Sequence, residues 1–159
     1  MFSAKTYAAR RNMLRTKIGS GIVLFPGNPL SPNNYPNNAY YFRQDSSFLY
    51  YFGLNVPSLA GLIDADTGEE ALYGDDFTVE DIIWTGPQPT LRELGAKVGI
   101  AATYPLSELE KRLRKAISLG RKIHFLPPYR GETKLWLSSL LGIKPTLLHD
   151  YKSVELMFA

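Results

Sequence analysis

The most informative part of the sequence for the fold is the segment Tyr41-Phe42-Arg43-Gln44-Asp45-Ser46-Ser47-Phe48-Leu49-Tyr50-Tyr51-Phe52-Gly53-Leu54. Asp45 is a residue type that accepts hydrogen bonds from the free N–H groups at the start of a helix. Gly53 is a favourable residue just after a helix end. The segment therefore predicts a short helix between Asp45 and Gly53 that carries Phe48 and Phe52 in the wall of the core.

Aromatic residues are concentrated in this helix and in the stretch before it. Between residues 35 and 52 they are Tyr35, Tyr40, Tyr41, Phe42, Phe48, Tyr50, Tyr51 and Phe52. The preceding stretch, NPLSPNNYPNNAYY, predicts an irregular loop because Asn and Pro interrupt regular structure. Since tyrosine favours positions that are half apolar and half solvated, this aromatic cluster is a candidate contact surface.

The chain before this loop predicts a helix over 3–18 and a buried strand over 21–27. Gly19 and Gly21 end the helix, and an apolar run rich in β-branched residues follows. The positions that share one stripe of the helix are Ala4, Tyr7, Leu14 and Ile18.

The chain after Pro57 predicts two strands, over 59–65 and 69–74, joined by Asp66-Thr67-Gly68. Asp-Thr-Gly also occurs in aspartic proteases, but such a site needs two carboxylates that share a proton. Only a homodimer could supply the second carboxylate. A hairpin turn is the favoured interpretation.

The rest of the sequence alternates between helix and strand signals. Helices are expected from Thr78, over 90–96, from a capping box of Ser107 and Glu110 to Gly120, over 132–141, and from Asp150; strands are expected over 122–126 and 146–149. The face of the 107–120 helix is marked by Leu106, Leu109, Leu113 and Ile117. This alternation predicts an α/β fold with a mixed β-sheet flanked by helices.

Composition indicates a globular chain. Of 159 residues, 45% are hydrophobic and 21% charged, with a formal net charge of +3. The basic residues gather in two groups, Arg10, Arg11, Arg15 and Lys17, and Lys111, Arg112, Arg114 and Lys115, which are expected on solvated helix faces. We expect no nucleic-acid partner and no membrane partner. Cysteine is absent, which permits a reducing cytoplasmic location.

Few residues of this chain are suited to catalysis or to metal binding. The two histidines are His124, expected to be structural within a strand, and His149, expected as a capping or surface group at a strand end. No HExxH, G-x-S-x-G or phosphate-binding glycine pattern occurs. The sequence therefore predicts neither a catalytic residue nor a metal site within these residues.

Several motifs together resemble the N-terminal domain of aminopeptidase P. The segment quoted first is similar to the family signature FRQDSxFxYLTGF, and Arg10-Arg11-Asn12-Met13-Leu14 is similar to the Arg-Arg-x-x-Leu of its first helix. Pro57 and Ile83-Trp84-Thr85-Gly86 also fit the family pattern. The resemblance covers most of residues 2–150. It implies a creatinase/prolidase-type, ribonuclease-H-like domain over 1–150, with 151–159 as the start of a linker to a catalytic domain.

The resemblance also implies a role in a larger enzyme. Full-length relatives of this family are metallopeptidases that remove the N-terminal residue preceding proline. Their separate catalytic domain binds two metal ions, usually manganese, through Asp, Asp, His, Glu and Glu, and none of these ligands can be placed here. The expected partners are the chain's own C-terminal catalytic domain, further copies in a homo-oligomer and a peptide substrate. We expect a piece of such an enzyme or a free-standing relative.

The resemblance gives candidates for substrate access or for an interface. Trp84 matches a family tryptophan that can lean over a neighbouring subunit's substrate, although it could simply pack within the domain. Gly86 is followed by Pro87-Gln88-Pro89 where the family often has Gly-Arg-Arg, which weakens any basic contact there. The further candidates lie in the loop and after it, and they are Asn37, Asn38, Tyr40 and Arg43.

Arg43 is expected as a buried or half-buried anchor that ties the loop to carbonyl groups or to Asp45. Two alternatives stay open for the whole chain. One is a binding module that holds a peptide or small molecule in the loop rich in Asn and Tyr. The other is the N-terminal domain of prolidase or creatinase.

Overall fold

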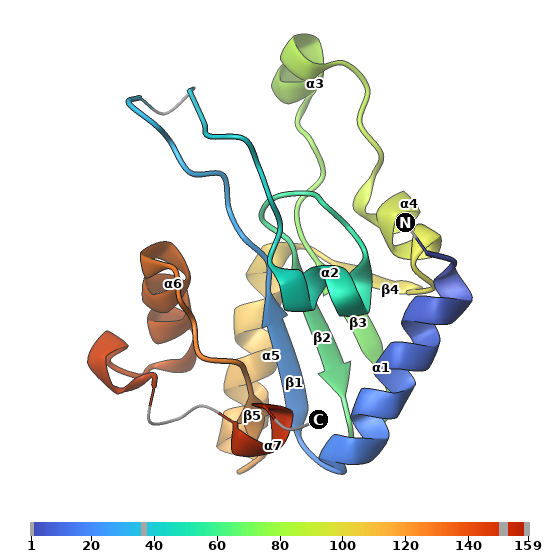
Figure 1. The fold of residues 1–159 in the computed structure, drawn as a ribbon, viewed down its shortest axis with the longest axis vertical. Coiled ribbons are helices and arrows are strands. Elements are labelled where there is room, and N and C mark those ends of the chain that lie inside the picture. Colours follow the sequence, from blue (N-terminus) through green and yellow to red (C-terminus); the bar gives the residue numbers. More distant parts are fainter. Residues whose placement is uncertain (1, 36–37, 150–152, 158–159) are drawn as a thin grey trace.

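The fold is a five-stranded mixed sheet between two groups of helices (Figure 1), as seen in a computed structural model that describes residues 2–35, 38–149 and 153–157. The strand order is β4-β3-β2-β1-β5. The strands are β1 (Ile22–Pro26), β2 (Ala60–Asp64), β3 (Glu70–Tyr73), β4 (Ala102–Tyr104) and β5 (Ile123–His124). The helices are α1 (Ala4–Ile18), α2 (Ser46–Phe52), α3 (Val79–Thr85), α4 (Leu91–Lys97), α5 (Leu106–Ser118), α6 (Gly131–Leu141), a 3₁₀ turn η1 (Pro145–Leu147) and α7 (Val154–Met157).

Pairing within the sheet confirms the predicted mixed α/β architecture. Strand β2 pairs antiparallel with both β1 and β3, while β1–β5 and β3–β4 are parallel pairs. The β2–β3 connection is the hairpin expected at Asp66-Thr67-Gly68, where Gly68 has φ +79°. Asp64 Oδ1 accepts hydrogen bonds from the N–H groups of Asp66 and Thr67, each at 3.1 Å. The turn interpretation of this motif is thus confirmed.

Each face of the sheet has its own apolar core, as the two-residue period of a strand requires. In β1, Val23 and Phe25 face the core under α1, α2 and α4, whereas Ile22 and Leu24 face the core under α5 and α6. The predicted short helix is confirmed as α2. Asp45 caps it by accepting from the N–H groups of Ser47 and Phe48, and Gly53 ends it in the left-handed conformation with φ +66°.

Arg11 corrects the expectation that its basic group lies on a solvated face. It is fully buried, and its Nε donates to Glu70 Oε2 at 2.7 Å. Its two terminal nitrogens donate to the carbonyl oxygens of Tyr51 and Val98, each at 3.0 Å. One guanidinium therefore joins α1 to β3, to α2 and to the residue that follows α4.

The start of α5 differs from the predicted capping box of Ser107 and Glu110. The helix begins at Leu106, and its N-cap residue, Pro105, has no side chain that can accept a hydrogen bond. Asp75 supplies the acceptor from another part of the chain, with its Oδ1 3.1 Å from the N of Leu106. On the buried face Ala116 takes the place expected for Ile117, which is 43% exposed.

Near the C-terminus and at one edge of the sheet, the structure differs from the sequence expectations in three places. Residues 145–147 form a 3₁₀ turn in place of the expected strand over 146–149, because Pro145 presets the backbone for a helical turn. The sequence analysis missed β4, which has three residues and lies at the sheet edge. Strand β5 covers only two residues of the range 122–126. The helix start expected at Asp150 lies outside the described residues, and α7 begins later.

Candidate functional site

The α3 helix lies at the tip of an arm, residues 75–90, that leaves the sheet after β3 and returns at α4 (Figure 1). All seven residues of α3 are exposed, including four apolar ones. Trp84 is 83% exposed, Val79 77% and Ile83 74%. A helix of this length is not stable in water through its own hydrogen bonds, and exposed apolar clusters mark contact sites. The arm is therefore the leading candidate for a contact surface.

Local sequence explains why a helix forms at this tip. Thr78 and Asp81 form a capping box, in which Thr78 Oγ1 accepts from Asp81 N at 3.2 Å and Asp81 Oδ2 accepts from Thr78 N at 2.9 Å. The hydrogen bonds from the Thr78 hydroxyl and N–H lower the pKa of Asp81. Gly86, with φ +76°, ends the helix. The predicted start at Thr78 is confirmed.

The base of the arm is hydrogen-bonded to the helices that precede and follow β4 in the sequence, α4 and α5. Asp76 Oδ1 accepts from the N of Leu91, the first residue of α4, at 2.5 Å. Asp75 makes the corresponding bond to the first residue of α5. Both carboxylates satisfy N–H groups that a helix leaves unpaired. These two hydrogen bonds therefore fix the base of the arm to the rest of the domain, although the tip of the arm is exposed.

The long loop between β1 and α2 rises from the same end of the sheet as the arm (Figure 1). The register shows this, because Pro26 at the end of β1 pairs with Ala60, which in turn pairs with Tyr73 at the end of β3. The loop is more regular than predicted. Pro32 and Ala39 form an antiparallel bridge, supported by hydrogen bonds from Tyr40 N to Ser31 O and from Asn33 N to Asn38 O.

The structure separates the candidate residues into two groups. Trp84 is on the arm, while Asn38 and Tyr40 are on the loop. Tyr40 is 60% exposed, and Asn38 is half-buried with its Nδ2 2.7 Å from Asn34 Oδ1. Asn37 lies outside the described residues.

Arg43 is exposed, and the contact found for its side chain is a hydrogen bond to Ser46 Oγ at 3.2 Å. The expectation of a buried or half-buried anchor was therefore wrong. Its neighbour Gln44 has that role, since it is 1% exposed. Gln44 Oε1 accepts from Asn28 N and Asp45 N, and its Nε2 donates to Val56 O. An uncharged amide can be buried with full pairing more readily than a guanidinium.

The sequence analysis missed a set of hydrogen bonds that joins the β1–α2 loop and the residues after it to residues 129–132. Ser31 receives a hydrogen bond from Arg130 and donates one to Glu132 Oε1 at 3.3 Å. Tyr129 donates to Asp45 Oδ2 at 3.1 Å. These partners are separated by 84 to 101 positions, so no local pattern could indicate them.

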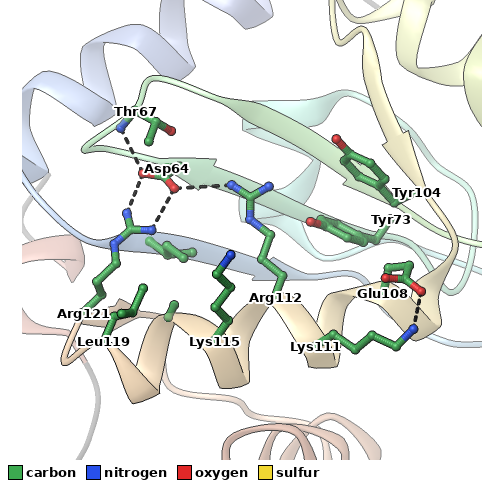
Figure 2. A pocket seen from close by; sticks show the side chains of 12 residues that line it. Asp64, Thr67, Tyr73, Tyr104, Glu108, Lys111, Arg112, Lys115, Leu119 and Arg121 are labelled. Carbon is green, nitrogen blue, oxygen red and sulfur yellow. Dashed lines mark hydrogen bonds and ion pairs between the residues drawn. The ribbon is translucent and has the colours of Figure 1, made fainter.

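A charged cleft lies on the α5 side of the sheet, away from the arm's tip. It has a volume of about 480 Å³, and Figure 2 shows Arg112, Lys115 and Arg121 pointing into it from α5 and the turn that follows. Asp64, which is 1% exposed, is the central carboxylate. Its oxygens accept from Arg121 at 2.6 and 3.0 Å and from Arg112 at 3.3 Å.

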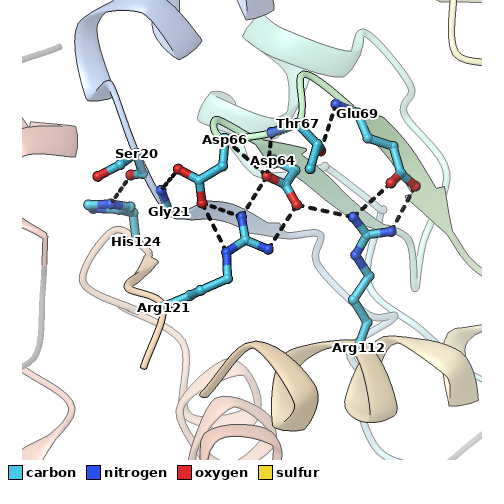
Figure 3. A network of polar contacts seen from close by, with 9 residues as sticks. All are labelled: Ser20, Gly21, Asp64, Asp66, Thr67, Glu69, Arg112, Arg121 and His124. Carbon is cyan, nitrogen blue, oxygen red and sulfur yellow. Dashed lines mark hydrogen bonds and ion pairs between the residues drawn. The ribbon is translucent and has the colours of Figure 1, made fainter. Parts of the chain in front are cut away.

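The outer carboxylates of this cluster are also paired (Figure 3). Arg112 binds Glu69 through two nitrogens at 2.7 and 2.9 Å, and Arg121 binds Asp66. The predicted structural role of His124 is confirmed, because it is buried with Nε2 3.0 Å from Ser20 O and Nδ1 2.7 Å from Ser153 Oγ. His149 is exposed in a turn and not at a strand end. The cluster joins β2 and the β2–β3 turn to α5 and to the turn that follows α5.

Asp64 makes the stability of the domain depend on pH. Burial alone would raise the pKa of Asp64, but hydrogen bonds from Arg121 and from Thr67 N–H outweigh it and lower the pKa from 3.8 to about 2. A carboxyl whose pKa is lower in the folded chain stabilises the fold above its unfolded pKa. The stabilisation, about 2 kcal/mol, is therefore lost as the pH falls from about 4 to about 2.

We expect urea unfolding to show this loss in the natural sequence between about pH 5 and pH 2.5. The Asp64→Asn variant is less stable at pH 5 but loses about 2 kcal/mol less over the same range. A pH dependence that is unchanged by the substitution contradicts the assignment.

Comparison with known proteins identifies the domain. The family model described as "Aminopeptidase P, N-terminal domain" matches residues 7–136. The chain belongs to the aminopeptidase P N-terminal domain family.

Solved structures of aminopeptidase P share the fold. The enzyme from Escherichia coli superposes with a TM-score of 0.73 at 20% identity, over 89% of this chain and 33% of that chain. The Pseudomonas aeruginosa aminopeptidase PepP gives 0.74 at 19% identity, over 94% and 34%. The predicted fold of the aminopeptidase P N-terminal domain is thus confirmed.

Curated relatives of this aminopeptidase P N-terminal domain are much longer than the chain. An uncharacterized peptidase of Saccharomyces cerevisiae is 27% identical over 111 residues, which are 70% of this chain and 21% of the relative. A probable Xaa-Pro aminopeptidase of Aspergillus flavus is 22% identical over 149 residues, 93% of this chain and 26% of the relative. The chain spans about a quarter of the length of these relatives or less.

Within residues 2–35, 38–149 and 153–157, no group of three or more His, Cys, Asp or Glu is placed to hold a metal ion. In the same residues, no helix has the length and apolarity needed to cross a membrane.

Proposed function

We propose that this chain is the non-catalytic N-terminal domain of a metal-dependent Xaa-Pro aminopeptidase. Its α3 arm and its β1–α2 loop shape the entrance to an active site carried by a separate C-terminal catalytic domain. Residues 1–150 form the domain, and 151–159 begin the linker. The enzyme removes the N-terminal residue that precedes proline, and it acts in the cytoplasm.

The observation that carries this proposal is that no residue of α3 is buried. Trp84 and its apolar neighbours form an exposed apolar surface of the kind that marks a contact site. In a homo-oligomer, the covering surface is the mouth of a neighbouring copy's active site, with Trp84 over the bound peptide. Tyr40 and the half-buried Asn38 approach the same entrance from the loop.

The metal ions of the enzyme do not fit this domain. Among the described residues, the carboxylates of the charged cleft are paired with arginines or, for Glu108, with Lys111, and His124 is held by Ser20 and Ser153. We therefore place the two ions, with manganese as the proposed metal, in the catalytic domain. The chain's own residues position and enclose the substrate.

Peptide cleavage by the full-length protein tests this proposal. Purified protein from the complete reading frame is expected to release the first residue of an Xaa-Pro peptide when manganese is present. A chelator is expected to abolish the activity, and added manganese to restore it. A peptide with alanine in place of proline is the matched control. Equal cleavage of both peptides, or of neither, contradicts the proposal.

A further inference from the structure

The arm carries an unusual set of charges. Residues 75–91 contain four carboxylates and no lysine or arginine. Three of the four have structural partners: Asp75 and Asp76 accept from the N–H groups of Leu106 and Leu91, and Asp81 closes the capping box with Thr78. Glu80 differs from them.

Glu80 is exposed, and among the residues that the structure describes it has no hydrogen bond or ion pair. It stands four positions before Trp84 in α3, and residues four apart lie on the same helix face. The arm thus places one free carboxylate and one indole ring, both exposed, a single helical turn apart.

Such a pair has the chemistry to recognise a cation. An ammonium or guanidinium group is attracted to the face of a tryptophan ring, and a nearby carboxylate adds a charged hydrogen bond. Residues 75–91 contain no lysine or arginine, so the arm has no cation of its own that could occupy this pair in place of a ligand. Glu80 lies in the first turn of α3, where the helix dipole favours a carboxylate, but it makes no capping hydrogen bond because Thr78 and Asp81 complete the box.

We infer that Glu80 and Trp84 together form a specificity element that favours peptides whose N-terminal residue is arginine or lysine. This inference rests on the proposed function, because it requires the arm to face the bound peptide. Trp84 covers any substrate, whereas Glu80 adds preference for a positive side chain.

The test compares two peptides in the full-length protein. One begins with Arg-Pro and the other with citrulline-Pro, which has nearly the same shape without the charge. We expect Glu80→Gln to lower the ratio of kcat/KM between the arginine and citrulline peptides by about three- to five-fold. Raising the salt concentration is expected to lower the same ratio in the natural protein and to change it little in the variant.

Two controls separate this inference from the proposed function. Glu110→Gln removes an exposed carboxylate of α5 and should leave the ratio unchanged. Trp84→Ala should lower kcat/KM for both peptides. If Trp84→Ala lowers both values while Glu80→Gln leaves the ratio unchanged, the inference is overturned and the proposed function stands. If Trp84→Ala affects neither peptide, both are overturned.

Discussion

Replacing Trp84 with alanine in the full-length protein is expected to lower kcat/KM for Xaa-Pro peptides by roughly 30-fold. This corresponds to the loss of about 2 kcal/mol, the scale of an aromatic hot-spot residue that becomes buried on assembly. The stability of the 159-residue domain should change by less than about 0.5 kcal/mol, because the indole is 83% exposed within it.

Leu135→Ala is the matched control for this substitution. Leu135 is an apolar residue of α6 that is 65% exposed and lies outside the arm. Its removal should leave kcat/KM within about two-fold of the natural value. Unfolding curves of both domain variants establish that the fold is intact. A Trp84→Ala enzyme with natural activity excludes the arm from the substrate entrance.

Replacing Arg11 with leucine is expected to lower the free energy of unfolding of the domain by about 3–5 kcal/mol, the largest single effect on stability. The substitution leaves Glu70, whose side chain is 21% exposed, without its cation. It also removes the donors to the carbonyl oxygens of Tyr51 and Val98. Urea unfolding followed by circular dichroism measures the change.

Arg114→Leu serves as the control for Arg11→Leu, because it removes an arginine that is 61% exposed and paired with Glu110. Its expected cost is below about 0.5 kcal/mol. The double substitution of Arg11 and Glu70 by leucine should recover part of the lost stability, since no buried charge is then unpaired. A loss below about 1 kcal/mol for Arg11→Leu contradicts the central role given to its guanidinium.

Sequence patterns predicted the elements whose signals are local. Asp45 and Gly53 predicted α2 because a capping side chain and a left-handed glycine act on the nearest turn. Thr78 predicted the start of α3 in the same way. The aspartate-threonine-glycine turn between β2 and β3 also depends only on adjacent residues.

Features that depend on distant partners were missed. Asp75 caps α5 across 31 positions, so the local residues Ser107 and Glu110 gave a misleading signal. Arg11 contacts partners 40 to 87 positions away, and its neighbours in sequence do not distinguish it from the more exposed Arg10. Strand β4 is too short for its alternation to be recognised.

The candidate site was predicted in part. The family motif pointed to Trp84, but the sequence left its packing open, because an apolar residue in a short helix fits a core as well as an interface. The structure shows it exposed at the tip of an arm. The free carboxylate at Glu80 could not be recognised until the partners of Asp75, Asp76 and Asp81 were known.

We propose that these 159 residues serve an active site that they do not contain. Assay of the purified chain alone, with manganese and an Xaa-Pro peptide, tests it most directly. We expect no release of the N-terminal residue above the rate in buffer. Metal-dependent release by the chain alone would contradict it.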